Sequence, residues 1–265
     1  DARGEKLDVT GSAIYCLSLV ALMYGFSLLP QLLGSWLILL GIIGIAIFIS
    51  WELKVKAPVI DMNLFRGNTV FTFSVLAALI NYSATFAVSF FLSLYLQYIK
   101  GSTPQDAGLI LVAQPVVMVV FSPLAGRLSD RIEPGKIASV GMAITAVGLF
   151  LFAFLDEKTT LEFIIFSLIL VGFGFALFSS PNTNAVMSSV EKRFYGIASA
   201  TLGTMRLVGQ MLSMGIAMII FAVFIGRVEI TPEYYMSFLK SMNTAFIIFS
   251  ALCFAGVFAS LARVR

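Results

Sequence analysis

Long apolar runs recur along the whole sequence, and they decide what the chain can fold into. Each run is about 20 residues long, the length that an α-helix needs to cross the hydrocarbon core of a bilayer. A transmembrane β-barrel would show alternating segments of about 10 residues instead. Of the 265 residues, 59% are hydrophobic and 12% are charged, whereas a soluble domain has about 45–50% and about 25%. We therefore expect an all-α polytopic membrane protein.

The breaks between the runs predict eight transmembrane helices. They are expected at residues 10–29, 35–53, 68–99, 105–128, 137–155, 161–180, 196–225 and 241–261. A polar linker that starts near residue 52 and continues to residue 66 separates the first two helices from the last six. We therefore expect two parts: residues 1–67, with a cytoplasmic segment, two extra helices and the linker, and residues 68–265, a six-helix domain.

The basic residues predict how the chain is oriented in the membrane. Eight crossings place both termini on one side, and the loops on that side carry twelve basic residues, namely Arg3, Lys6, Lys54, Lys56, Arg66, Arg127, Arg131, Lys136, Lys192, Arg193, Arg263 and Arg265. The opposite side carries four, namely Lys100, Lys158, Arg227 and Lys240. Because Lys and Arg are enriched in cytoplasmic loops, we expect a protein of the cytoplasmic membrane with both termini in the cytoplasm.

The residue types that catalysis needs are missing from the apolar runs. The sequence has no His, and its two cysteines, Cys16 and Cys253, lie in separate runs. All fourteen Asp and Glu residues fall in loops or within about a turn of a helix end. Without a recognisable nucleophile, base or cluster of metal ligands, we expect no enzyme, no cofactor and no metal site. The net charge of +3 does not indicate a nucleic-acid partner, because in a membrane protein the positions of Lys and Arg reflect the orientation of the chain in the membrane.

The expected helix at residues 196–225 carries small and polar side chains along one face. Ser199, Gly203, Arg206, Gln210 and Ser213 follow one another at steps of four, three, four and three residues, which places them on the same side of a helix. A charged residue inside a membrane helix almost always faces a cavity or a partner. Arg206 and Gln210 are therefore candidates to line a substrate pathway. The alternative is that Arg206 reaches the headgroups or makes a structural contact between helices.

Three other side chains are candidates for the same cavity. Asn81 lies on a stripe of small and polar residues in the helix at 68–99, and Gln114 immediately precedes Pro115. Phe175 is one of three phenylalanines, with Phe173 and Phe178, on the helix at 161–180. Aromatic side chains of this kind can repack around different lipophilic ligands. The alternatives are an ordinary interhelical hydrogen bond for Asn81 and Gln114 and ordinary apolar packing for Phe175.

A short basic turn between the fourth and fifth expected helices resembles a family motif. It contains Gly126, Asp130 and Arg131, followed by Gly135 and Lys136. This pattern resembles the loop motif of the major facilitator superfamily, which lies between the second and third helices of each six-helix half. Counted from residue 68, the turn occupies that place. The two helices before the linker match the extra pair of the 14-helix drug:proton antiporter branch, of the EmrB and QacA type.

The resemblance implies a function and a role for the turn. It implies the C-terminal half of an exporter of lipophilic, often cationic, compounds that works by alternating access and is driven by proton entry. The partner would be an N-terminal six-helix half, and the proton-coupling acids are expected there because none lies inside an apolar run here. The turn would act as a conformational-switch loop, with a solvated turn as the alternative reading.

Two other functions stay open from the sequence. The chain could be a structural half-domain without transport activity of its own. It could also belong to an exporter of a lipid or a metabolite.

Overall fold

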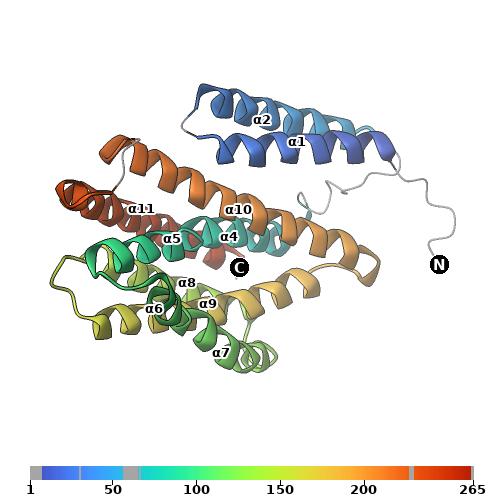
Figure 1. The fold of residues 1–265 in the computed structure, drawn as a ribbon. Coiled ribbons are helices and arrows are strands. Elements are labelled where there is room, and N and C mark those ends of the chain that lie inside the picture. Colours follow the sequence, from blue (N-terminus) through green and yellow to red (C-terminus); the bar gives the residue numbers. More distant parts are fainter. Residues whose placement is uncertain (1–7, 30, 56–64, 66, 227–229, 264–265) are drawn as a thin grey trace.

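The computed structural model describes residues 8–29, 31–55, 65, 67–226 and 230–263 and contains only helices within them (Figure 1). Eight helical segments in these ranges are long and apolar enough to cross a membrane. The expectation of an all-α polytopic protein with eight membrane helices is confirmed. The polar segment at residues 1–7, the linker residues 56–64 and 66, and the basic residues Arg227 and Arg265 lie outside the described residues.

Two helices near the N-terminus form a hairpin beside the main bundle (Figure 1). They are α1, Val9–Ser27, and α2, Leu32–Glu52. Glycines let their backbones approach closely: a Cβ added to Gly34 would lie 2.7 Å from the carbonyl oxygen of Gly25. The hairpin contacts the bundle through α10, Tyr195–Phe224, where Tyr15 Oη donates a hydrogen bond of 2.8 Å to Thr204 Oγ1.

The two segments predicted as single helices at 68–99 and 105–128 are each interrupted. The first consists of α4, Thr69–Thr85, and α5, Val88–Leu94, followed by a π-helical turn at Tyr95–Ile99. The second consists of α6, Pro104–Leu111, and α7, Ala113–Ser129. Pro115 has no N–H to offer the carbonyl of the residue four positions earlier, which accounts for the break between α6 and α7.

Three later helices also differ from the predicted bounds. The loop after α7 is followed by α8, Pro134–Phe152, and then α9 runs from Leu161 to Ser188, beyond the predicted end at residue 180. Pro181 is accommodated inside α9, since membrane helices tolerate proline where neighbours satisfy the freed backbone. The last helix, α11, spans Tyr235–Ala262 and starts before the predicted residue 241, after a 3-10 turn that begins at Pro232.

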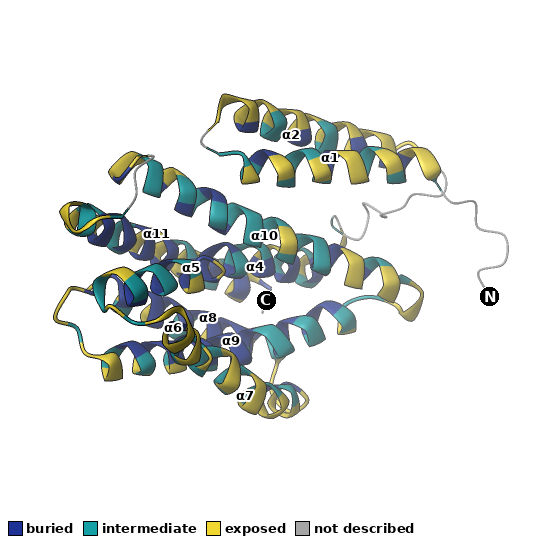
Figure 2. Ribbon diagram, in the orientation of Figure 1, coloured by how far each residue is buried: buried dark blue, intermediate teal, exposed yellow. Residues whose placement is uncertain are grey.

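The protein core lies among α4, α8, α9 and α11, while α6 and α7 lie at the edge (Figure 2). In the apolar window of Thr69–Ile99, 61% of the residues are buried, against 6% in that of Pro104–Ser129. The largest buried side chains are aromatic and include Phe91, Phe152 and Phe246. The face next to α6 and α7 is therefore the side of the bundle that this chain leaves uncovered.

A buried arginine joins the helix ends at the end of the bundle that holds residues 130–133, which we call the loop end. Arg263 is 3% exposed, and its guanidinium donates hydrogen bonds to Ser74 Oγ, Ser260 Oγ and Asn182 Oδ1. Ser139 Oγ lies 2.7 Å from Ser260 Oγ. Burial lowers the pKa of Arg263 to about 10, so the side chain stays protonated at neutral pH. Arg263 thereby links α4, α9 and α11, and the contact between Ser139 and Ser260 adds α8.

Replacing Arg263 with Met should destabilise the bundle. The change leaves Asn182 and two serine hydroxyls buried without their donor, and each unsatisfied buried group costs about 1–3 kcal/mol. We expect the midpoint of thermal unfolding in detergent to fall, by about 2–4 °C for each kcal/mol lost. The matched control is Arg193→Met, because Arg193 forms an exposed ion pair with Glu191. Equal midpoints for the two variants would contradict a structural role for Arg263.

Candidate substrate-binding groove

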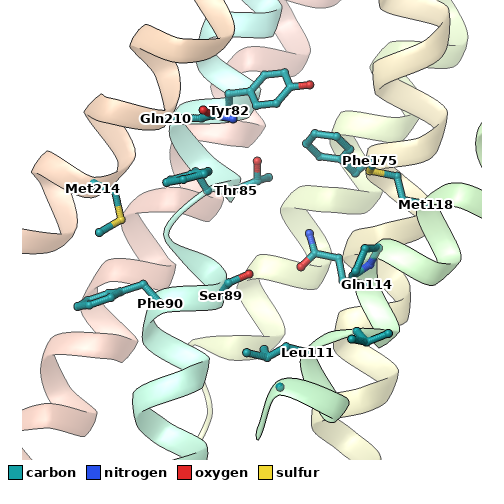
Figure 3. Close-up of a pocket in the computed structure, with 14 residues that line it drawn as sticks. Tyr82, Thr85, Ser89, Phe90, Leu111, Gln114, Met118, Phe175, Gln210 and Met214 are labelled. Carbon is teal, nitrogen blue, oxygen red and sulfur yellow. The ribbon is translucent and has the colours of Figure 1, made fainter. Parts of the chain in front are cut away.

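A groove of about 840 Å³ lies between α4–α5, α6–α7, α9 and α10 (Figure 3). This size lies in the range of about 300–1,000 Å³ that is typical of small-molecule sites. Its aromatic and thioether side chains are Tyr82, Phe86, Phe90, Met118, Phe175 and Met214. Its hydroxyl and amide side chains are Thr85, Ser89, Gln114 and Gln210. The groove therefore has an apolar surface with a few polar groups, as ligand pockets do.

Aromatic packing shapes one wall of the groove. The rings of Tyr82, on α4, and Phe175, on α9, meet edge to face with their centroids 5.3 Å apart. The two neighbouring aromatic residues of α9 have other partners: Phe173 packs against Phe121, and Phe178 is buried in the core. Only Phe175 of this group lines the groove. The prediction for Phe175 thus agrees with its position.

Two glutamine side chains face the groove from opposite walls (Figure 3). Gln114 lies at the start of α7, and a Cβ added to Gly172 of α9 would lie 2.5 Å from its carbonyl oxygen. Gln210 lies on α10, directly after Gly209. Within the described part of the chain, neither side-chain amide makes a hydrogen bond, so both are available to a ligand. The predictions for Gln114 and Gln210 agree with these positions.

A second, more polar cavity of about 520 Å³ lies closer to the loop end. We call it the Arg206 pocket; besides Arg206 it is lined by Ser122, Ser179, Ser180, Thr183, Asn184 and Met187. Arg206 Nη2 donates a hydrogen bond of 2.7 Å to Thr183 Oγ1, and its guanidinium carbon lies 5.7 Å from the ring centroid of Tyr82. Because Tyr82 also lines the groove, this ring connects the two cavities.

Asn81 does not line either cavity. Its side chain is fully buried, and neither its amide nitrogen nor its amide oxygen has a hydrogen-bond partner among the described residues. Thr85 and Ser89, which lie on the same predicted stripe as Asn81, do line the groove, and Tyr82 lines it beside them. Asn81 therefore lies outside the cavity that it was predicted to line. A search for polar residues misses Tyr82. The tyrosine lies directly after Asn81 in the sequence, and its aromatic ring with a hydroxyl could have indicated a groove-lining residue.

The breaks in the first helical segment also affect the groove. The backbone N–H of Ala87, between α4 and α5, donates a hydrogen bond of 3.0 Å to Ser213 Oγ. Ser213 is fully buried and so serves the backbone of the neighbouring helix. Three residues of the polar face predicted on α10 thus have different positions. Arg206 lines the Arg206 pocket and Gln210 lines the groove, while Ser213 packs against the break between α4 and α5.

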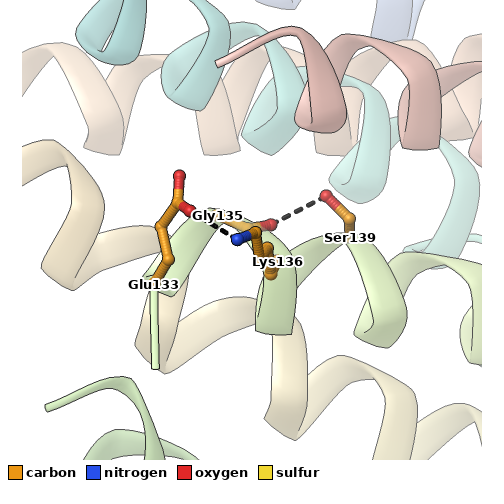
Figure 4. Close-up of polar contacts among 4 residues, drawn as sticks. All are labelled: Glu133, Gly135, Lys136 and Ser139. Atoms are coloured by element: carbon orange, nitrogen blue, oxygen red, sulfur yellow. Dashed lines mark hydrogen bonds and ion pairs between the residues drawn. The ribbon is translucent and has the colours of Figure 1, made fainter. Parts of the chain in front are cut away.

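The residues of the family-like motif surround the loop between α7 and α8, which is shorter than the connection expected between residues 128 and 137. Gly126 lies in the last turns of α7, and Gly135 and Lys136 lie in the first turn of α8, so residues 130–133 form the connection. Lys136 Nζ lies 3.1 Å from Glu133 Oε2, and Ser139 Oγ donates to the Gly135 carbonyl (Figure 4). Asp130 and Arg131 are exposed. Within the described part of the chain, their side chains form no hydrogen bond or ion pair.

Nothing in the described ranges forms a metal centre: no group of three or more His, Cys, Asp and Glu residues is placed to hold an ion. No Asp or Glu among the described residues lines the groove or the Arg206 pocket. The groove and the Arg206 pocket together present aromatic faces, three amides, several hydroxyls and one guanidinium.

The chain is similar to known transporters in sequence. The model of the Major Facilitator Superfamily matches residues 74–265. The chain is 34% identical to the uncharacterized transporter YebQ of Escherichia coli, over 79% of this chain and 46% of YebQ. It is 26% identical to the riboflavin transporter RibZ of Clostridioides difficile, over 100% of this chain and 58% of RibZ. It is 25% identical to the multidrug resistance protein Stp of Mycobacterium tuberculosis, over 78% of this chain and 39% of Stp.

The fold is also that of a solved transporter. The crystal structure of a bacterial homologue of the human lysosomal transporter Spinster, inward-facing and occupied, matches with a TM-score of 0.63 at 15% identity. The match covers 96% of this chain and 63% of that one. This chain therefore spans from about two fifths to under two thirds of the length of the proteins that it resembles.

A methyl group at Gly209 should separate α10 from α4. The added Cβ would lie 2.6 Å from the Leu79 carbonyl oxygen and 2.9 Å from Tyr82 Cβ, and such overpacking typically costs about 1–3 kcal/mol. We expect Gly209→Ala to lower the thermal unfolding midpoint. Gly203→Ala, on the same helix, is the control, because a Cβ there meets nothing within 4 Å and Ala favours a helix by about 0.8–1 kcal/mol. If Gly203→Ala lowered the midpoint as much as Gly209→Ala, the close contact between α10 and α4 at Gly209 would not be the cause of the destabilisation.

Proposed function

Because the chain belongs to the Major Facilitator Superfamily, whose model matches residues 74–265, we propose that it is the C-terminal half of a 14-helix, proton-coupled exporter of lipophilic compounds. The match to Stp, a multidrug resistance protein, supports the substrate class. The share of each relative that this chain spans supports the assignment as one half. In this proposal residues 1–67 supply the two extra helices, and residues 68–265 form the transporter domain.

The observation that carries the proposal is the groove on the uncovered side of the bundle. Aromatic and methionine side chains can repack around ligands of different shape, and Tyr82, Phe175, Met118 and Met214 supply such a surface. Gln114 and Gln210 face the same space, and their side chains have no hydrogen-bond partner among the described residues. Facing lipid, these amides would lack the hydrogen bonds that they need. The N-terminal six-helix half would cover them and complete the cavity.

The proton-coupling groups belong to the other half in this proposal. Proton relays in membrane proteins use Asp, Glu or His inside the bilayer, and the sequence has no His. No acidic side chain of the described residues lines the groove or the Arg206 pocket. A cationic substrate would likewise find its counter-charge in the N-terminal half.

The turn at residues 130–133 is proposed to be the conformational-switch loop, on the cytoplasmic side with both termini. Asp130 and Arg131 are exposed and free of intramolecular ion pairs in the described structure. They can therefore bind the N-terminal half in one transport state and release it in another, which biases the equilibrium between states. Gly126, Gly135 and Lys136 lie in the helix ends that frame this turn.

A second candidate is the export of a metabolite. RibZ, a riboflavin transporter, matches over the whole length of this chain, and the Arg206 pocket offers several hydroxyls to a polar ligand. Efflux of riboflavin, with no efflux of lipophilic dyes, would favour this candidate.

Efflux from energised vesicles tests the main proposal. Vesicles would contain either this chain alone or the full-length polypeptide with its N-terminal helices, and the probes would be ethidium, a cation, and Nile red, a neutral dye. We expect efflux only from the full-length protein, and we expect a protonophore to abolish it because proton entry supplies the driving force. Efflux from the 265-residue chain alone would overturn its assignment as a half, and absence of both dye efflux and riboflavin efflux from the two preparations would support a purely structural role.

Phe175→Ala should weaken transport of lipophilic probes. The ring is already buried in the protein, at 8% exposure, but it forms part of the groove wall and packs edge to face against Tyr82, an arrangement worth about 0.5–1.5 kcal/mol. We expect the Nile red concentration that gives half-maximal efflux to rise about tenfold. Phe258→Ala is the control, because Phe258 is 62% exposed on α11. A similar rise in the control would show that the effect does not come from the groove.

A further inference from the structure

The Arg206 pocket carries a positive charge without an acidic partner among the residues that the structure describes. Arg206 donates one hydrogen bond to Thr183, and its Nε is buried without a partner among the described residues. The remaining lining consists of hydroxyls, one amide and one thioether. Serine and threonine hydroxyls both donate and accept hydrogen bonds, so they can bind an oxyanion beside the guanidinium.

A guanidinium inside a membrane protein needs a counter-charge. An unpaired charge at the bilayer centre costs at least about 2.5–3.5 kcal/mol, and one neutral hydroxyl is a weak substitute for a carboxylate. The ring face of Tyr82, 5.7 Å from the guanidinium carbon, adds about 0.5–2 kcal/mol at most. The guanidinium can bind two oxygens of one acidic group side by side. The pocket is therefore suited to a negatively charged oxygen group.

The groove continues from this charge as an aromatic surface. Tyr82 contacts Arg206 on one side and Phe175 on the other. A flat ring system placed against Phe175 and Met118 would have its polar edge within the space that Gln114 and Gln210 line. An acidic group on the same molecule would extend toward Arg206. The two cavities thus match the two ends of one amphiphilic molecule.

We propose that this transporter half also binds amphiphilic aromatic anions, whose carboxylate, sulfonate or phosphate group binds Arg206 and whose rings lie in the groove. The proposal rests on the proposed function and adds this substrate class to the lipophilic compounds proposed there. Arg206 is then a specificity-determining residue, and its bond to Thr183 is a resting contact that the ligand replaces. Two other sources of the counter-charge are a carboxylate of the N-terminal half and the phosphate of an anionic lipid.

Binding of two related dyes tests the proposal. Fluorescein and rhodamine 6G share the xanthene ring system, but fluorescein is an anion and rhodamine 6G is a cation at neutral pH. Their fluorescence anisotropy would be measured with the full-length protein in phosphatidylcholine nanodiscs, with empty nanodiscs subtracted. We expect Arg206→Gln to raise the Kd of fluorescein at least tenfold and to leave that of rhodamine 6G unchanged or lower. Arg206→Lys should retain part of the fluorescein affinity, since it retains the charge.

Controls separate this proposal from its competitors. Arg193→Gln removes an exposed charge near the start of α10 and should leave the Kd of both dyes unchanged. Equal loss of both dyes in Arg206→Gln would indicate a structural pair with the other half and would overturn the proposal. So would an unchanged Kd for fluorescein.

A second nanodisc arm identifies a lipid ligand. If phosphatidylglycerol in the nanodiscs removes the Arg206-dependent binding of fluorescein, the site belongs to a lipid headgroup, and the assignment to substrate is overturned. Retained binding in these nanodiscs supports a soluble anion as the ligand. Binding of fluorescein is measured without efflux. A failure of ethidium and Nile red transport would therefore refute the proposed export function without deciding whether Arg206 binds an anion.

Discussion

The bilayer requires every backbone N–H and C=O group in its interior to find a partner within the protein, and the architecture of this chain follows from that requirement. Where the helices are regular, the requirement is met locally. Where the first long segment breaks between α4 and α5, the N–H of Ala87 is satisfied by Ser213 of α10. This bond joins the broken segment to the helix that carries Gln210 and Arg206. The break that shapes the groove is therefore tied to the adjacent wall, which α10 forms.

Close backbone contacts set where the walls of the groove stand. Gly209 brings α10 against α4, and Gly172 brings α9 against the start of α7. Because apolar side chains gain little from leaving lipid for a protein interior, membrane helices associate through such small-residue contacts and through hydrogen bonds. The Gly172 contact involves the backbone of Gln114, and the Gly209 contact involves Cβ of Tyr82, two residues that also line the groove. Packing and binding thus use different atoms of the same residues.

The sequence was sufficient to predict the eight helices, because each depends on a pattern along one apolar run. Gln114, Phe175, Gln210 and Arg206 lie at the two cavities, and their role in binding stays a prediction. Asn81 was chosen because it is polar, but it is buried and does not line the groove. Which face of α4 meets the groove depends on how α4 packs against its neighbouring helices, and this packing brings Tyr82 to the groove. Arg263 was counted only as a loop charge, since nothing local distinguishes an exposed arginine from a buried one.

The network around Arg263 has a consequence for how the bundle responds to pH. Its members are a guanidinium, serine hydroxyls and an amide, and the pKa of Arg263 remains at about 10. None of these groups changes its charge between roughly pH 4 and pH 9. Glu133, whose charge raises the pKa of Arg263, lies in the loop at residues 130–133, so acidification acts on the junction of α4, α8, α9 and α11 through this loop and not through the hydrogen bonds of the network.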